Sequence, residues 1–149
     1  MSISVVPFRE EWQEEVQSLL WAYLEERWGT LDRTLNPDIL AIKETFREGV
    51  FVVALEEGKV IGTGGFLPET PESARIVRMT VVKGRRGAGI GTAVMDCLVK
   101  EAVRQGYKRL VLETTETWES AIGFYLRYGF QLLGYWGGDA HFALELCPA

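Results

Sequence analysis

The chain has 149 residues, of which 47% are hydrophobic and 25% are charged, and its formal net charge is −5. This length suits a single globular domain over residues 1–149, and the acidic balance argues against nucleic acids or anionic membranes as partners, because both attract positive surface. With no apolar run of about 18 residues and no signal-peptide layout at the start, we expect a cytoplasmic protein that does not bind membranes.

The first two predicted elements are a short strand at residues 3–6 and a long helix at residues 10–28, which Gly29 ends. On this helix one stripe is expected to face the core, made of Trp12, Val16, Leu19 and Tyr23. Trp21 and Trp28 lie together on nearly the opposite side. Three interpretations stay open for this pair: a wall of a substrate pocket, a docking site for another subunit such as the second copy of a homodimer, or burial by neighbouring elements.

The later elements alternate in a pattern typical of an α/β domain. A second helix is predicted from Asn36 to Gly49, with Ile39, Ile42 and Phe46 as its apolar face. Three strands, a helix, a strand, a helix and two final strands follow, at residues 50–55, 60–66, 74–82, 90–105, 109–114, 118–128, 130–135 and 141–146. The last two are expected to pair antiparallel. This order predicts an α/β domain (α+β in some classifications) with a mixed sheet.

A basic, glycine-rich loop joins the strand at residues 74–82 to the helix at residues 90–105. It reads Lys83-Gly84-Arg85-Arg86-Gly87-Ala88-Gly89-Ile90-Gly91-Thr92. Glycines let the backbone approach a ligand closely, and the free N–H groups at a helix start attract anions, so the loop is predicted to bind phosphate. The spacing fits neither a P-loop, which needs Gly-Lys-Ser/Thr, nor a dinucleotide fingerprint, whose third glycine would fall at Thr92.

The loop does contain the pattern R-x-x-G-x-G, from Arg86 through Gly89 to Gly91, which resembles the pyrophosphate-binding motif of the GNAT superfamily of acyl-CoA-dependent N-acyltransferases. A second segment, AIGFYLRYGF at residues 121–130, resembles the family's A-x-x-(aromatic or Leu)-Tyr-x-x-x-Gly-Phe segment. The resemblance covers about residues 50–146. It implies a single GNAT-like domain: a mixed, mostly antiparallel sheet with a central splayed parallel strand pair, flanked by helices.

The resemblance also implies acetyl-CoA as the co-substrate. Its pantetheine arm would lie between the splayed strands at residues 74–82 and 109–114, pairing with backbone like an extra strand. The Val81 N–H would bind the acetyl carbonyl as charge develops on that oxygen. Further contacts are expected from one strand residue, the loop and the second motif: Met79, Arg85, Arg86, Gly87, Ala88, Gly89, Ile90, Gly91, Thr92 and Tyr125. Trp118 departs from the pattern, since many relatives carry an asparagine there.

Two side chains are the catalytic candidates. Tyr125 matches the tyrosine that protonates the coenzyme A thiolate in many family members, although it could instead simply pack on its helix. Glu113, at the end of a strand near the slot, is the acidic residue best placed to take a proton from the attacking amine. His141 is a second candidate for that role, but a structural histidine is the more ordinary interpretation.

The expected reaction is direct transfer of the acetyl group of acetyl-CoA to a primary amine of a small molecule, with no acyl-enzyme. Trp21, Trp28 and Arg78 are the candidate acceptor-binding residues, and either Arg75 or Arg78 could bind an acceptor carboxylate. Two alternatives stay open: a protein or peptide N-acetyltransferase, which would need an open groove, and a non-catalytic acetyl-CoA-binding sensor.

No metal is expected. Only one histidine, His141, is present, so a multi-histidine site is impossible. Neither Cys97 nor Cys147 has a Cys or His nearby at metal-ligand spacing, and Cys97 falls on the apolar stripe of its helix, where core packing is expected.

Overall fold

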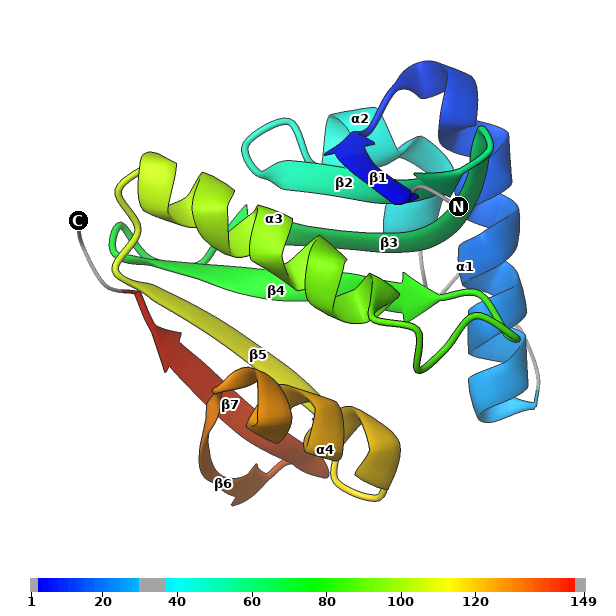
Figure 1. Cartoon of the computed structure of the whole chain (residues 1–149). Helices are drawn as coiled ribbons and strands as arrows, with labels where there is room; N and C mark the ends of the chain where they lie inside the picture. Colours follow the sequence, from blue (N-terminus) through cyan, green and yellow to red (C-terminus); the bar gives the residue numbers. More distant parts are fainter. Residues whose placement is uncertain (1–2, 30–36, 147–149) are drawn as a thin grey trace.

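The chain forms one seven-stranded sheet with helices on both faces, in a computed structural model that describes residues 3–29 and 37–146 (Figure 1). Asn36 and Cys147 lie outside these residues. The first half contains β1 (Ile3–Pro7), η1 (Glu10–Trp12), α1 (Gln13–Trp28), η3 (Pro37–Ala41), α2 (Ile42–Thr45), β2 (Val50–Glu56) and β3 (Lys59–Pro68). The second half contains β4 (Ser73–Val81), α3 (Ile90–Arg104), β5 (Arg109–Thr115), α4 (Glu119–Tyr128), β6 (Gln131–Trp136) and β7 (Asp139–Glu145).

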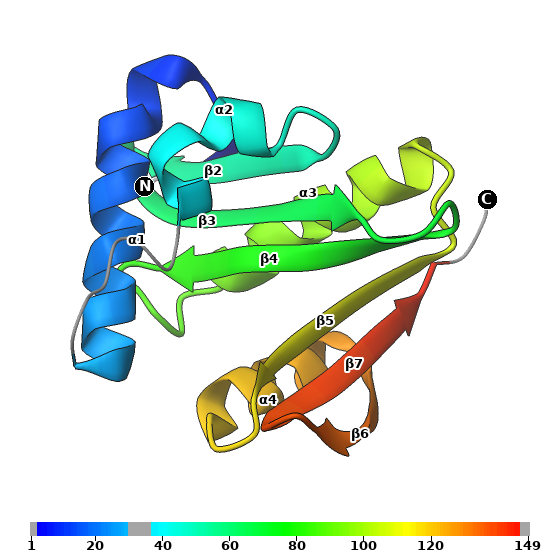
Figure 2. The same cartoon turned by 180° about the vertical axis from the view of Figure 1, so that it is seen from behind.

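The strand order is β1-β2-β3-β4-β5-β7-β6, and β4 and β5 form the one parallel pair among these described strands. The backbones of β4 and β5 pair only from Ser73 opposite Arg109 to Arg75 opposite Val111. Beyond that point the two strands diverge and leave a V between them (Figures 1 and 2). The predicted mixed sheet and splayed parallel pair are confirmed, as is the antiparallel pairing of the last two strands.

Helices cover the two halves of the sheet differently. α3 lies on one face of β2, β3 and β4, and α4 lies on the same side of β5 and β7, while α1 and α2 cover the opposite face of the first half (Figures 1 and 2). Each face of the first half has its own apolar cluster. Val94, Met95 and Leu98 of α3 are fully buried in one, and Val16 and Leu20 of α1 in the other.

The second predicted helix is the one element that forms differently. Instead of a continuous helix, residues 37–45 make the 3-10 turn η3 and the four-residue α2, and Ala41, the last residue of η3, has a non-helical conformation. The Gln13 side chain occupies the backbone groups at this break: its Nε2 donates to Ile39 O at 2.8 Å, and its Oε1 accepts from Ile42 N at 3.0 Å. A distant side chain therefore replaces the helical hydrogen bonds, while Ile39, Ile42 and Phe46 are buried as predicted.

Among the described residues, no helix combines the length and the apolar character that crossing a membrane requires. Within the same residues, no group of three or more His, Cys, Asp or Glu side chains is arranged to hold a metal ion.

Candidate active site

The loop between β4 and α3 borders a cavity of about 480 Å³, here called the loop cavity. Gly89, just before α3, has a φ of 83°, a left-handed conformation that glycine adopts without steric cost. Ala93 N is the first amide of α3 to bond back within the helix, to Gly89 O at 3.0 Å, so the amides of the preceding first turn have no intrahelical acceptor. Gly91 and Thr92 of this turn line the cavity, which therefore suits an anion.

The two arginines of this loop have different surroundings. Arg86 lines the loop cavity, where its guanidinium donates to both carboxylate oxygens of Glu26 on α1 at 2.8 and 2.9 Å. Its Nε also donates to Val81 O at 3.0 Å. The hydrogen bond from Arg86 lowers the pKa of Glu26 and raises the pKa of Arg86. Arg85 instead donates to Glu56 at 2.6 Å, outside the cavity lining.

The end of β4 presents a backbone N–H group to the V. Val82 N donates to Ile61 O of β3 at 2.9 Å. Along a strand, the N–H groups of successive residues point alternately to its two edges. The N–H of Val81 therefore points away from β3, to the other edge of β4. Arg86 takes up Val81 O on that same edge. Because β5 has already diverged there, the Val81 N–H faces the loop cavity that its residue lines.

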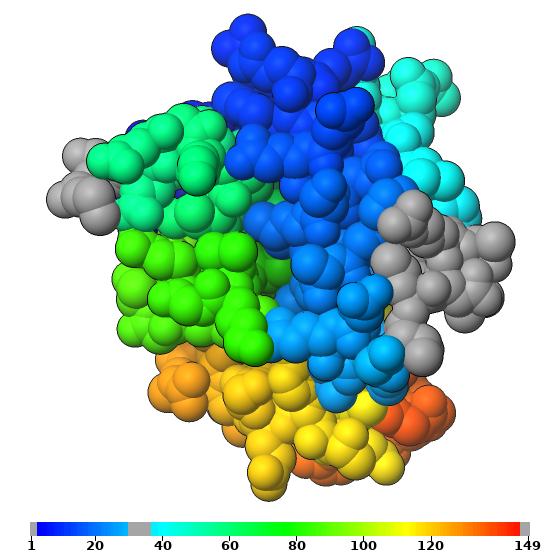
Figure 3. All heavy atoms as spheres, turned by 90° about the vertical axis from the view of Figure 1, so that its right-hand side faces the viewer, coloured from blue at the N-terminus to red at the C-terminus, as the bar shows by residue number. Residues whose placement is uncertain are grey.

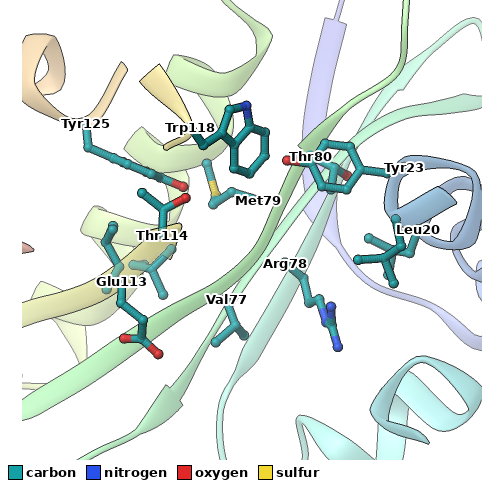
Figure 4. Close-up of a pocket in the computed structure, with 13 residues that line it drawn as sticks. Leu20, Tyr23, Val77, Arg78, Met79, Thr80, Glu113, Thr114, Trp118 and Tyr125 are labelled. Carbon is teal, nitrogen blue, oxygen red and sulfur yellow. The ribbon is translucent and has the colours of Figure 1, made fainter. Parts of the chain in front are cut away.

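A second cavity of about 140 Å³, here called the inner cavity, lies deeper between the splayed strands (Figure 4). It is lined by α1, β4 and β5, including Leu20 and Leu24 of α1, Val77 and Arg78 of β4, and Glu113 and Thr114 of β5. The residues that line both cavities are Tyr23, Met79, Thr80, Trp118 and Tyr125. A group held in one cavity can therefore meet a group held in the other at these five side chains.

Two tyrosines approach this junction from opposite sides. The Tyr125 ring extends from α4 and the Tyr23 ring from α1 (Figure 4). Burial raises the pKa of Tyr125 well above its ordinary value, and burial also raises the pKa of Tyr23 to about 12, against a smaller lowering by Arg86. Both hydroxyls therefore keep their protons at neutral pH and can donate hydrogen bonds.

Two charged side chains, Glu113 and Arg78, line the inner cavity, and each is held in an ion pair. Glu113 pairs with Arg75, which also donates to Glu69 at 2.9 Å. Arg78 donates to both oxygens of Asp38 at 2.7 and 2.8 Å. Glu113 and Arg78, the two charged side chains that line this cavity, together carry no net charge, and Glu113 supplies the carboxylate that attracts a cationic guest. His141 stacks on Trp136 with ring centroids 3.8 Å apart, and it lines neither cavity.

The C-terminal half of α1 lies across the open end of the V (Figure 3). Tyr23 contacts the Trp118 ring with centroids 5.6 Å apart, and the Arg27 guanidinium lies 4.5 Å from the Trp118 ring and 4.7 Å from the Trp28 ring. We call these four side chains, Tyr23, Arg27, Trp28 and Trp118, the aromatic clasp. The Glu26–Arg86 ion pair holds α1 against the β4–α3 loop on one side of the V, and the clasp holds it against Trp118, at the start of α4, on the other side.

A sequence profile of the acetyltransferase (GNAT) family matches residues 13–130. The chain belongs to this family. Human N-acetyltransferase 8B is 32% identical to it over 124 residues, which cover 77% of this chain and 55% of that protein. The mouse probable N-acetyltransferase family 8 member 5 is 38% identical over 107 residues, covering 67% and 47%. This GNAT chain therefore spans about half the length of the curated relatives it matches.

Solved GNAT structures share the fold. An acetyltransferase of the GNAT family from Staphylococcus aureus superposes with a TM-score of 0.90 at 20% identity, covering 98% of this chain and 100% of that one. The PaiA N-acetyltransferase from Thermoplasma acidophilum, solved in complex with coenzyme A, gives 0.86 at 16% identity, with coverage of 97% and 99%. The family and the fold that the two motifs implied are thereby confirmed.

The structure brings most of the predicted cofactor residues of this GNAT domain to the loop cavity: Met79, Val81, Arg86, Gly87, Gly89, Gly91, Thr92 and Tyr125. Arg85 and Ala88 do not line it, and the Ile90 side chain is buried in the core. Arg78 and Glu113 line the inner cavity, whereas Trp21 packs against the apolar cluster beneath α1, and Trp28 is 58% exposed.

Sequence reasoning missed Tyr23 as a site residue. The helical stripe assigned Tyr23 to the core together with Val16, but the ring sits one helical turn beyond the buried Leu20, where α1 passes the edge of the core. Tyr23 lies three residues after Leu20, a spacing that puts both side chains on one face of the helix, and that face lines the inner cavity.

Proposed function

We propose that the chain is an acetyl-CoA-dependent N-acetyltransferase that acetylates the primary amine of a small molecule by direct transfer. The observation that carries this proposal is the pair of cavities that meet at Tyr23, Met79, Thr80, Trp118 and Tyr125. One cavity carries the helix start and Arg86, which suit a diphosphate, and the other is lined by the Glu113 carboxylate, which can attract an ammonium group. The coenzyme A in the PaiA neighbour from Thermoplasma acidophilum supports the assignment of the donor.

In this proposal the loop cavity holds acetyl-CoA. The first-turn amides of α3 and the Arg86 guanidinium bind the pyrophosphate, and the pantetheine arm lies along the edge of β4 that β5 leaves unpaired. The Val81 N–H then donates to the acetyl carbonyl and stabilises the negative charge that develops on its oxygen during attack.

The acceptor amine enters the inner cavity and attacks the thioester carbon. Glu113 takes the ammonium proton, directly or through water, before the attack. As the carbon–sulfur bond breaks, the Tyr125 hydroxyl protonates the departing thiolate, and burial keeps that hydroxyl protonated at neutral pH until then. The nitrogen gives up its second proton as the amide forms, and this proton restores the Tyr125 hydroxyl. Tyr23 faces Tyr125 at the junction, where its hydroxyl can orient the amine.

A small acceptor is preferred over a protein because of the enclosure. The inner cavity is small, and the aromatic clasp holds α1 across the end of the V where an extended peptide would need an open groove. Apolar side chains of α1 and β4, among them Leu20, Leu24 and Val77, line one side of this cavity and would contact the acceptor's carbon skeleton.

The test is acetyl-CoA-dependent thiol release over a panel of amino acids, polyamines, aminoglycosides and short peptides, with an amine-free blank subtracted. Release with a small amine, coupled to formation of its N-acetyl product by mass spectrometry, is the expected outcome. Preferential turnover of peptides would replace the small-molecule acceptor by the protein alternative. Tight acetyl-CoA binding without turnover of any panel member would favour the sensor.

A further inference from the structure

Arg78, inside strand β4, has an unusual backbone conformation. Its φ is +56°, a left-handed value that costs free energy for any residue with a Cβ. Glu57, the other non-glycine residue with a positive φ in the described part of the chain, lies in the turn between β2 and β3, where such values are ordinary. A strained residue inside a strand persists only if its surroundings hold it there.

The strain coincides with a bulge in β4. Thr63 of β3 pairs with Thr80, and Gly65 pairs with Val77, so Arg78 and Met79 together face Gly64. A Cβ atom on Gly64 would come within 2.6 Å of the Met79 sulfur, so this glycine makes room for the bulge. One extra residue reverses which amides beyond it face β3, and it is therefore the bulge that turns the Val81 N–H toward the V.

Two side chains from outside β4 hold Arg78 in this conformation. Asp38 of η3 binds the guanidinium through both carboxylate oxygens, at 2.7 and 2.8 Å. Thr63, which is fully buried, donates its hydroxyl to Arg78 O at 2.8 Å and lies 2.7 Å from the Thr80 hydroxyl. These contacts fix the bulge at three points: the Arg78 side chain, the Arg78 carbonyl, and Thr80, the next residue of β4 that pairs with β3.

Asp38 is itself held in place. Thr45 Oγ1 donates to Asp38 O at 3.1 Å, and Gln13 of α1 bridges η3 and α2 through Ile39 and Ile42. The carboxylate that grips Arg78 therefore belongs to a well-braced segment rather than to a free loop.

We propose that Arg78 is a positioning residue that acts through its backbone: the Asp38 carboxylate and the Thr63 hydroxyl lock it in the left-handed conformation, and the lock keeps the Val81 N–H directed at the acetyl carbonyl. This inference rests on the proposed acetyl transfer. It also replaces the expectation that Arg78 binds the acceptor, because Asp38 already occupies the Nε and Nη2 edge of its guanidinium with a two-pronged contact.

A matched pair of substitutions separates the backbone role from a substrate-binding role. Arg78→Ala and Arg78→Gly both delete the guanidinium, but only glycine adopts a positive φ without cost. We expect Arg78→Ala to lower kcat about tenfold or more, and Arg78→Gly to stay within about threefold of the wild type. If Arg78 bound the acceptor, both variants would instead raise the acceptor KM by the same factor.

Asp38→Asn extends the test without altering β4. This change weakens the ion pair with the guanidinium, so kcat should fall in the protein that keeps arginine at position 78. In the Arg78→Gly background the same change should have no effect, because no guanidinium remains to be held and the glycine needs no lock. An equal effect of Asp38→Asn in both backgrounds would overturn the proposal.

The amide resonance of Val81 in the free protein gives a readout that needs no turnover. It should keep its wild-type position in Arg78→Gly and shift in Arg78→Ala and Asp38→Asn. Unshifted resonances in all three variants would contradict the lock even if the enzyme acetylates amines. Conversely, a wild-type protein that acetylates no amine, but shows these shifts, would contradict the proposed function and leave the lock supported.

Discussion

Glu26 of α1 and Arg86 of the β4–α3 loop form a two-pronged ion pair with contacts of 2.8 and 2.9 Å. The Glu26 carboxylate thus occupies the guanidinium that we propose binds a diphosphate, and it places a negative charge beside the loop cavity. In the proposed complex, acetyl-CoA must therefore compete with Glu26 for Arg86.

From this competition we predict opposite effects of two substitutions on the acetyl-CoA dissociation constant. Glu26→Gln should lower it about two- to fivefold, because an exposed ion pair contributes little and its loss frees Arg86. Arg86→Gln should raise it about tenfold or more. Isothermal titration calorimetry measures both, and Arg85→Gln, whose side chain pairs with Glu56 outside the cavity, serves as the control. Weaker binding by Glu26→Gln would mean that Glu26 aids the ligand.

Tyr125→Phe should lower kcat about 100-fold and change the acetyl-CoA dissociation constant by less than about twofold, because it removes the proton donor and keeps the buried ring. The matched control is Tyr128→Phe on the same helix. The Tyr128 hydroxyl bonds to Asp96 at 2.6 Å and lines neither cavity, so its loss should leave kcat unchanged. Equal losses in both variants would point to helix packing instead of proton transfer.

The raised pKa of Tyr23 predicts a loss of stability in alkali. Below about pH 10 the tyrosine is neutral in both the folded and the unfolded chain. Above that pH the unfolded chain ionises first, because burial holds the folded pKa at about 12, so the free energy of unfolding falls between these two values. Tyr23→Phe should show a shallower fall between pH 9 and pH 11 in urea denaturation. Parallel curves for the two proteins would exclude Tyr23 as the cause.

Glu113→Gln should lower kcat/KM at neutral pH, with a deficit that shrinks as the pH approaches the pKa of the acceptor amine. The reason is that an amine already deprotonated in solution no longer needs the carboxylate. Steady-state rates from pH 6.5 to 9.5 with one acceptor measure this profile. A deficit that stays constant over the whole range would assign Glu113 a structural role through its pair with Arg75.

Trp118→Ala should widen acceptor choice. The change removes the ring that Tyr23 and Arg27 contact, so kcat/KM for bulky amines and dipeptides should rise relative to the best small amine. The free energy of unfolding should fall by about 1–2 kcal/mol, from lost aromatic and cation–π contacts. Trp28→Ala removes only the outer ring of the clasp and should leave the selectivity unchanged. A Trp118→Ala enzyme with wild-type selectivity would show that the clasp does not limit the acceptor.

The succession of strands and helices along the chain, and the place of the glycine-rich loop before α3, could be predicted because local signals determine them. Glycines before α3, alternation in the strands and the Arg86–Gly89–Gly91 spacing act over a few residues. The break between η3 and α2 could not be predicted, because it depends on Gln13, which lies 26 residues before Ile39 in the sequence. The pairing of Arg78 with Asp38 depends on a separation of 40 residues and leaves no local pattern.

The short pairing between β4 and β5 has a mechanical consequence. Three residue pairs, from Ser73–Arg109 to Arg75–Val111, join the backbones of the two half-sheets, together with hydrogen bonds from Lys108 N and Arg109 N to Glu72 O. We therefore expect this seam to be the hinge about which the half formed by β5, β7, β6 and α4 moves when the contacts of the aromatic clasp break. Acetyl-CoA bound between β4 and β5 would restrain this movement. It should therefore slow amide hydrogen exchange at the seam more than in the centre of either half.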